Sequence, residues 1–299
     1  MLGIAIVAAI VPSVAGRAHA CSECLCGMPF PSDALGGAMP TGFRFGIEER
    51  YLSKSNALDD APGVEAEREH RVAGFVLWRA ADRLALLGRV PYNVKEITSS
   101  PVGEASARTT SRGLGDAEAM ALIGLWRGIG PRASTFAAVL GAIAPTGSND
   151  ARDATGARLD AHLQPGTGAW SANAGLNATL MIGDGALAAH LSGRWSGMNA
   201  HGYRYGRALL YDLGFTSAER RNVALLAQIN GRSAGADRLE DGSIGANTGG
   251  TVVYASPGVR WRTGIGVSVE AALKIPVLES LRGDQREHTT GRLAFSITP

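Results

Sequence analysis

The residues best suited to chemistry in this chain are three cysteines near its N-terminal end. Cys21, Cys24 and Cys26 form a C-x-x-C-x-C segment, and the 299 residues contain no other cysteine. Three thiolates so close together are soft ligands that suit copper(I) or zinc, and they could also hold a cofactor. In an oxidising compartment the same segment would form one local disulfide and leave one thiol over. The segment alone leaves both interpretations open.

Histidines offer the other chemical possibility. His190 and Ser192 stand two residues apart, which places both side chains on one face of a β-strand. A hydrolase also needs an acid or an amide to orient the histidine, and none is evident beside them in the sequence. His162 and His201 lie beside expected loops and could bind metal, but neither has a partner at ligand spacing. We therefore predict that the chain is not an enzyme.

The stretch from His162 to Ser217 indicates which elements position such residues. Apolar residues alternate there with polar or small ones over ten or more positions, and Gly-Asp-Gly at 183–185 reverses the chain. A period of two over that length is typical of a transmembrane β-strand, because a strand of a soluble protein is usually about half as long. The stretch therefore predicts three strands of a membrane barrel.

The same alternation recurs along the chain and predicts twelve strands in all. Tight turns alternate with long loops near residues 54–66, 97–113, 146–165, 198–204, 233–249 and 277–288. Short periplasmic turns and long extracellular loops are the layout of an outer-membrane barrel, and a soluble β-sandwich would not explain this rhythm. The strands are predicted at residues 41–53, 67–78, 84–97, 114–127, 134–145, 166–182, 186–197, 205–217, 222–232, 251–262, 267–275 and 289–298.

We therefore predict an all-β fold, a transmembrane up-and-down antiparallel β-barrel of about 12 strands that spans residues 41–299. Residues 114–127 are the least regular of the predicted strands. Alanine, glutamate, methionine and leucine predominate there, and all four are helix formers, so a helix competes with the strand. The turns on either side favour the strand.

Residues 1–20 predict export. An apolar run at residues 2–11 and the small-residue end Ala18-His19-Ala20 have the form of a cleaved signal peptide. The run is shorter than the ~20 residues that a transmembrane helix needs. No Lys or Arg precedes it, so we expect the true start to lie upstream or the basic region to be truncated. Lipidation of Cys21 is an alternative, although Ala18 stands where a lipoprotein signal normally has leucine.

Composition and net charge limit the kinds of partner that the protein is expected to bind. Residues 21–40 are rich in Pro and Gly as well as Cys, and they read as a periplasmic lead-in. Glycine is abundant at 40 residues and hydrophobic content is 45%, a dilution that suits strands with one lipid-facing side. The net charge of +2 does not suggest nucleic acid as a partner. We expect a bacterial outer-membrane location with lipid and a small-molecule solute as partners, whereas the oligomeric state is not readable.

The inward faces of the predicted strands carry charges of both signs with a basic excess. Such groups must pair with one another or meet water. One interpretation is a polar path for small solutes with a mild preference for anions, and the other is a salt-bridged interior that only fills space. The lumen-lining candidates are Arg44, Glu48, Arg50, Arg89, Lys95, Glu118, His190, Arg194, Asp212, Arg260, Glu270, Lys274 and Arg292, with Asp116 and Gln228 on the same faces.

Several short motifs resemble a transporter family labelled "MetA-pathway of phenol degradation". They are His162–Gly168, Tyr203–Gly206, Asp212–Gly214, Ser256–Gly258 and Ile275–Val277, and the resemblance extends over about residues 41–299. It implies an outer-membrane barrel that moves small, hydrophobic or aromatic compounds. Some relatives also carry a cysteine-rich start similar to Cys21–Cys26, and no catalytic residue is implied.

The sequence thus leads to two functional hypotheses. The first is an outer-membrane channel for small solutes, with hydrophobic or aromatic compounds as the solutes that the resemblance suggests. The second is a metal-related outer-membrane protein, in which Cys21, Cys24 and Cys26 hold copper, zinc or a cofactor at the periplasmic mouth.

Overall fold

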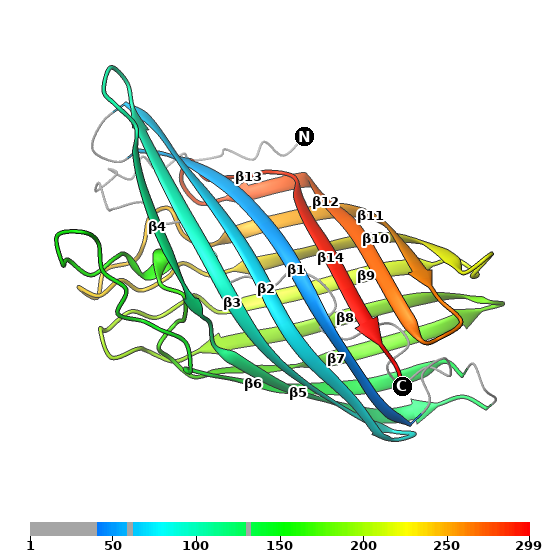
Figure 1. Cartoon of the computed structure of the whole chain (residues 1–299). Helices are drawn as coiled ribbons and strands as arrows, with labels where there is room; N and C mark the ends of the chain where they lie inside the picture. Colours follow the sequence, from blue (N-terminus) through cyan, green and yellow to red (C-terminus); the bar gives the residue numbers. More distant parts are fainter. Residues whose placement is uncertain (1–40, 59–61, 130–132) are drawn as a thin grey trace, which may run out of the picture.

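A computed structural model describes residues 41–58, 62–129 and 133–299. Within them the chain folds into one closed antiparallel β-barrel with a single short 3₁₀ turn, η1 (Ala161–Leu163) (Figure 1). No helix in the described part of the chain is long and apolar enough to cross a membrane. The expected signal peptide, the lead-in and its three cysteines lie outside the described residues.

The strands in chain order are β1 (Gly42–Ala57), β2 (Gly63–Ala81), β3 (Leu84–Pro101), β4 (Ala107–Leu114), β5 (Ala117–Arg127), β6 (Thr135–Ala144), β7 (Ser171–Ile182), β8 (Gly185–Ser196), β9 (Ala208–Thr216), β10 (Val223–Ala234), β11 (Gly250–Arg262), β12 (Val267–Leu281), β13 (Arg286–Glu287) and β14 (Thr290–Ile297). Most pair with their sequence neighbours, except around the short strands β4 and β13, and β1 closes the barrel by pairing with β2 on one side and β14 on the other.

The barrel wall has twelve strand positions around its circumference, called staves here, as the alternation predicts. β4 and β5 both pair with β3 and form one strand that is interrupted at Gly115 and Asp116. β13 adds two residues to the stave of β14, because both pair with β1. The strand at residues 114–127 is confirmed, and the helix that competed with it is wrong.

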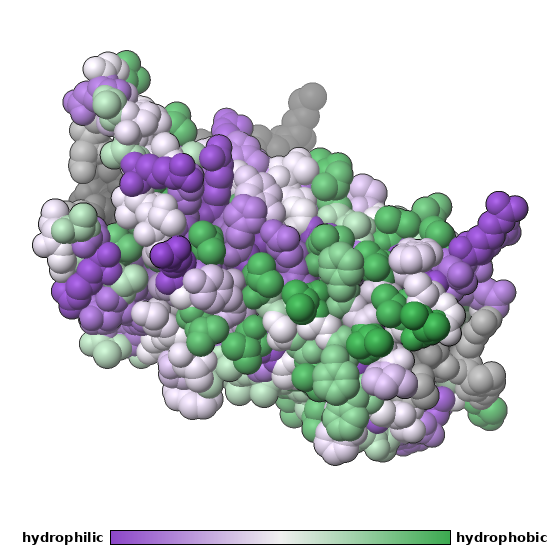
Figure 2. Space-filling model, in the orientation of Figure 1, coloured by the Kyte–Doolittle hydropathy of each residue, from purple (hydrophilic) through white to green (hydrophobic). Residues whose placement is uncertain are grey.

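Side chains alternate between an apolar outer face and a buried inner face. On β1, Phe43 is 46% and Ile47 is 57% exposed, whereas Glu48 is 3% exposed. The outward apolar residues form the green band over the barrel wall in Figure 2. At the periplasmic end of this band the rings of Phe43 and Trp78 stack with centroids 5.7 Å apart, as in the aromatic girdles of outer-membrane barrels.

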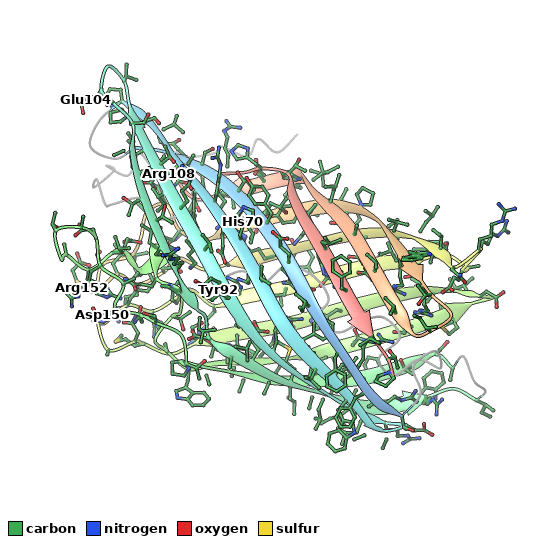
Figure 3. The ribbon with its side chains drawn as sticks, in the orientation of Figure 1. His70, Tyr92, Glu104, Arg108, Asp150 and Arg152 are labelled. Atoms are coloured by element: carbon green, nitrogen blue, oxygen red, sulfur yellow. The ribbon has the colours of Figure 1, made fainter. Side chains whose placement is uncertain are left out.

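Four staves continue past the apolar band on the extracellular side, where loops were predicted. The predicted loops 54–66 and 97–113 are largely strand, because β1 to β4 extend well beyond the predicted ends. The alternation of apolar and polar residues ends there because neither face of these strands touches lipid. The backbone hydrogen bonds between the strands continue beyond that point. Figure 3 shows this change along the outer surface, from Tyr92 on β3 to His70 and Arg108 farther along β2 and β4.

Two other boundaries differ in the opposite sense. The strands predicted to start at residues 166 and 205 begin at Ser171 and Ala208, and the preceding residues belong to loops. The loop predicted at 277–288 differs in the first sense, because β12 runs on to Leu281 and shortens it. The residues ahead of β7 and β9 are held by loop contacts at the barrel mouth, which a strand alternation does not encode.

Candidate functional site

The inside of the barrel and its extracellular mouth form the candidate site. The structure places all the predicted lumen-lining residues on the inward, buried or half-buried face of their strands. Their neighbours divide the wall into three sectors that differ in chemistry. The sectors follow the strand order, so each is built from consecutive staves.

The charged sector spans β11, β12, β14 and β1. The Glu48 carboxylate accepts hydrogen bonds from Nε of Arg50 at 2.5 Å and from Nε of Arg292 at 2.7 Å. Arg292 also forms an ion pair with Glu270, and Glu270 forms a second ion pair with Arg260 at 2.9 Å. Three guanidinium groups and two carboxylates therefore form one chain of ion pairs with a net charge of +1. A basic excess on a channel wall attracts anions.

The apolar sector occupies β2, β3, β5 and β6 toward the periplasmic end. Phe75 packs against it with a partly exposed ring. Sequence reasoning missed this sector because residues 114–127 are apolar on both faces, and the inward leucine and methionine there resemble lipid-facing ones. Its buried members are Leu77, Ala85, Leu87, Met120, Leu122, Ala137 and Val139.

The third sector, called the neutral sector, covers β7 to β10 and is lined mainly by amides and hydroxyls, with Arg194, Asp212 and Arg232 as its charged members. His190 contacts Ser192 there at 2.9 Å between Nε2 and Oγ. Asp212 lies directly opposite His190 in the register of β8 and β9, so an acid that the sequence did not reveal does stand beside the pair. Neither carboxylate oxygen of Asp212 accepts a hydrogen bond from the described residues, however. The three groups are therefore not linked as a catalytic triad.

Other predicted lumen residues hold the wall and the mouth. Arg89 pairs with Glu118 at 3.2 Å across β3 and β5, and Arg44 donates to Thr298 at 3.1 Å at the periplasmic end. Arg194 lines a small polar pocket inside the barrel. Lys274 places its Nζ 4.8 Å from the ring centroid of Tyr254.

The long segment between β6 and β7 folds inward and covers the extracellular mouth. Lys95 donates to the carbonyl of His162 at 3.0 Å, and Asn93 donates to that of Pro165 at 2.7 Å. Asp116, at the break between β4 and β5, accepts from the backbone of Thr167 at 2.8 Å and from its hydroxyl at 2.5 Å. The predicted lumen residue Lys95 thus ties this segment to the wall.

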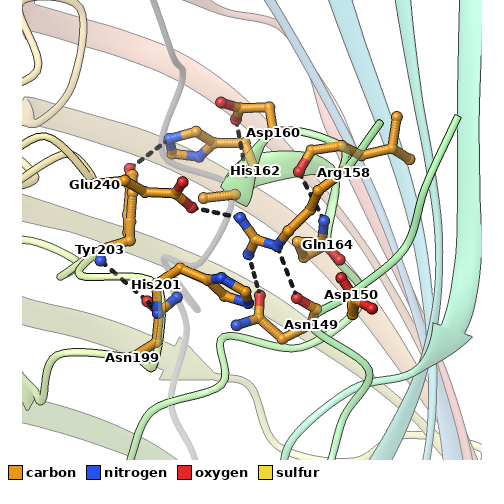
Figure 4. Close-up of polar contacts among 12 residues, drawn as sticks. Asn149, Asp150, Arg158, Asp160, His162, Gln164, Asn199, His201, Tyr203 and Glu240 are labelled. Atoms are coloured by element: carbon orange, nitrogen blue, oxygen red, sulfur yellow. Dashed lines mark hydrogen bonds and ion pairs between the residues drawn. The ribbon is translucent and has the colours of Figure 1, made fainter. Parts of the chain in front are cut away.

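A buried latch joins the covering segment to two further loops. The Tyr203 hydroxyl lies 2.8 Å from His162 Nε2, the contact drawn in Figure 4, and it donates to Asp237 Oδ2 at 2.6 Å. Because the hydroxyl gives its one proton to Asp237, His162 donates to Tyr203. Asp237 Oδ1 accepts from the Gly206 backbone at 2.7 Å. His162, considered from sequence as a metal ligand, therefore serves as a loop contact.

The described residues contain no group of three or more His, Cys, Asp or Glu side chains that could hold a metal ion. Cys21, Cys24 and Cys26 lie outside those residues, so the metal hypothesis stays a prediction. His201, the other histidine considered, is exposed on the loop before β9, and its backbone donates to Asn199 at 3.0 Å.

Comparison with solved structures places the fold among outer-membrane barrels. An outer membrane channel from Pseudomonas putida F1 superposes with a TM-score of 0.67 at 14% identity, covering 87% of this chain and 96% of that one. The translocator domain of autotransporter NalP from Neisseria meningitidis gives 0.51 at 12% identity, with 88% and 90% covered. The transport unit of AIDA-I from Escherichia coli gives 0.50 at 11% identity, with 88% and 92% covered. At these identities the likeness concerns the fold.

No curated protein matches the chain in sequence. The family model described as "Putative MetA-pathway of phenol degradation" matches residues 54–279. That match covers most of the barrel and confirms the resemblance carried by the motifs around residues 162–214. The chain is an outer-membrane β-barrel that belongs to this family.

Proposed function

We propose that the barrel is a channel that carries small solutes with an apolar, often aromatic, body across the outer membrane. The observation that carries this proposal is the continuous apolar sector inside a barrel whose remaining lining is mostly polar. Inward leucines such as Leu87 and Leu122 are 4% and 1% exposed, so they point into the barrel and pack against one another there rather than against lipid. A wall of this kind offers a passing apolar body contacts that water does not.

The charged sector supports a complementary role. Its guanidinium groups outnumber its carboxylates, so a solute with a polar or anionic head group meets an attractive wall beside the apolar one. The similar Pseudomonas structure is named an outer membrane channel, which agrees with transport. We infer a channel rather than a hydrolase, because His190 contacts Ser192 but neither oxygen of Asp212 accepts a hydrogen bond from the described residues.

Reconstituted protein tests the proposal. We expect single-channel currents in planar bilayers, and faster liposome uptake of benzoate than of an uncharged sugar of similar size. Leu122→Asn should slow benzoate uptake severalfold. Leu210→Asn is the matched control, because Leu210 also points inward and is 5% exposed but lies outside the apolar sector. Folded barrels that show neither conductance nor uptake would overturn the proposal and leave an interior that only fills space.

A further inference from the structure

The outer face of β1 to β4 changes in character on the extracellular side of the apolar band. The band ends there with Tyr92 and Leu114, which are register partners and are 43% and 57% exposed. The next three rows of outward side chains carry mostly charged and hydroxyl groups, and Figure 2 shows hydrophilic side chains beyond the band. These rows, called the basic face here, are Tyr51, His70, Val94 and Arg112, then Ser53, Arg68, Glu96 and Thr110, and then Ser55, Ala66, Thr98 and Arg108.

Arginines outnumber carboxylates on the basic face. The side chains of Arg68 and Arg108 are 59% and 67% exposed, and both meet the single carboxylate of Glu96. Arg68 lies 3.7 Å from one of its oxygens, whereas Arg108 forms a close ion pair with the other. Arg112 is exposed, and its side chain forms no hydrogen bond or ion pair with any described residue. Three arginines and one glutamate give the face a net charge of +2.

The basic face begins where the hydrocarbon ends. Strand residues rise about 3.4 Å each, so Arg112 lies about 7 Å along β4 beyond Leu114, and Arg68 about 14 Å along β2 beyond Val72. Lipid headgroups occupy about 5–8 Å outside the hydrocarbon core, and an arginine side chain can bend back toward that core while its carbons lie on apolar surface. Both guanidinium groups therefore reach the headgroups of the outer leaflet.

The chemistry of the basic face favours a headgroup that contains phosphate and sugar. A guanidinium group is planar and forms two parallel hydrogen bonds with phosphate oxygens. Ser53 and Thr110 lie in the same row as Arg68, and their hydroxyl groups can both donate to a sugar and accept from it. A plain phospholipid would satisfy the arginines but leave these hydroxyl groups to water. A phosphorylated glycolipid matches both kinds of group.

We propose that the basic face binds a phosphorylated glycolipid of the outer leaflet, with Arg68 and Arg112 on its phosphate groups. Arg108 keeps Glu96 paired, which neutralises the one carboxylate of the face and frees Arg68 to turn toward the lipid. The acyl chains of the same lipid would lie on the adjoining apolar band, beside Tyr92 on β3. The proposal concerns the outer wall of the barrel and does not depend on what passes through the lumen.

Purified full-length barrel in a neutral detergent allows a direct test. The two probes are diphosphoryl lipid A and the same lipid without its phosphates, and native mass spectrometry measures their binding. The diphosphoryl form should bind about tenfold more tightly, the size expected for a hydrogen bond between charged groups. Arg68→Gln/Arg112→Gln should remove most of that difference. Arg83→Gln/Arg220→Gln is the matched control, because it removes the same charge from exposed turns at the periplasmic end, and it should preserve the difference.

Each outcome bears on the basic face. Equal affinity of the unmodified barrel for the two lipids would overturn the proposal, and this arm needs no variant to fold. A preference that persists in Arg68→Gln/Arg112→Gln would also overturn it. An equal loss in the periplasmic control would show attraction by overall charge and no site. Inorganic phosphate that displaces the lipid at equal concentration would identify a site for free phosphate instead of a lipid.

Discussion

The carboxylate of Glu48 on β1 accepts a hydrogen bond from Nε of Arg292 on β14 at 2.7 Å, so an ion pair crosses the seam at which the barrel closes. Glu48 is 3% exposed and also holds Arg50 at 2.5 Å. The first and last strands are far apart in the sequence but pair at the seam. The Glu48 carboxylate links these two strands on the inner face of the barrel. It therefore contributes to closure and to the charge of the lumen at once.

Replacement of Glu48 by Gln should affect both properties. The variant leaves Arg50 without its carboxylate, whereas Arg292 keeps its pair with Glu270. Breaking a fully buried pair costs about 3–5 kcal/mol, and the loss here is smaller because both arginine side chains are partly exposed. We expect a lower thermal unfolding temperature by circular dichroism. The wall also loses a negative charge, so the reversal potential in a salt gradient should shift toward greater anion selectivity.

Glu49→Gln serves as the matched control for the seam. Glu49 is the next residue on β1 but faces outward, where it meets His70 at 3.1 Å with both side chains about half exposed. An exposed pair contributes little, so this variant should keep both stability and selectivity. Equal effects of the two variants would contradict a special role for the inward carboxylate.

The latch at the mouth makes a second prediction. Tyr203→Phe removes the hydroxyl that joins His162 to Asp237, a loss of about 1–3 kcal/mol for a buried hydrogen-bonded group. The covering segment should then loosen, which should raise the single-channel conductance and speed hydrogen exchange at residues 161–164. Tyr211→Phe, on β9, is the control and should change neither. Unchanged exchange in the latch variant would show that Lys95 and Asp116 suffice to hold the segment.

The sequence predicts the barrel well and its mouth poorly, for physical reasons. A period of two reports which face meets lipid, so the inward positions of Glu48, Asp212 and Arg292 follow from parity alone. It carries no information about contacts between distant loops, such as Tyr203 with His162. Nor does it separate an inward leucine such as Leu122 from an outward one when both faces are apolar.

The edge of the lipid band makes a third prediction. On β4, Leu114 faces outward and is 57% exposed, and Arg112 and Arg108 continue the same face. A spin label at residue 114 should therefore be accessible to oxygen, which concentrates in lipid, and one at residue 108 to a water-soluble nickel complex. Labelling requires a background in which the three native cysteines are serine. The same accessibility at both positions would place the boundary elsewhere.

The cysteine segment gives the last prediction, which concerns the metal hypothesis. Cys21, Cys24 and Cys26 supply three soft ligands, and thiolates bind zinc or copper(I) strongly when they are deprotonated. If they form a site, protein purified without chelators should carry close to one metal ion per chain by mass spectrometry. The triple Cys→Ser variant should lose it, whereas His162→Gln should retain it because His162 is committed to the latch. Equal metal content in the wild type and the triple variant would leave the segment as a disulfide with one free thiol, and channel conductance in the triple variant would show whether transport depends on it.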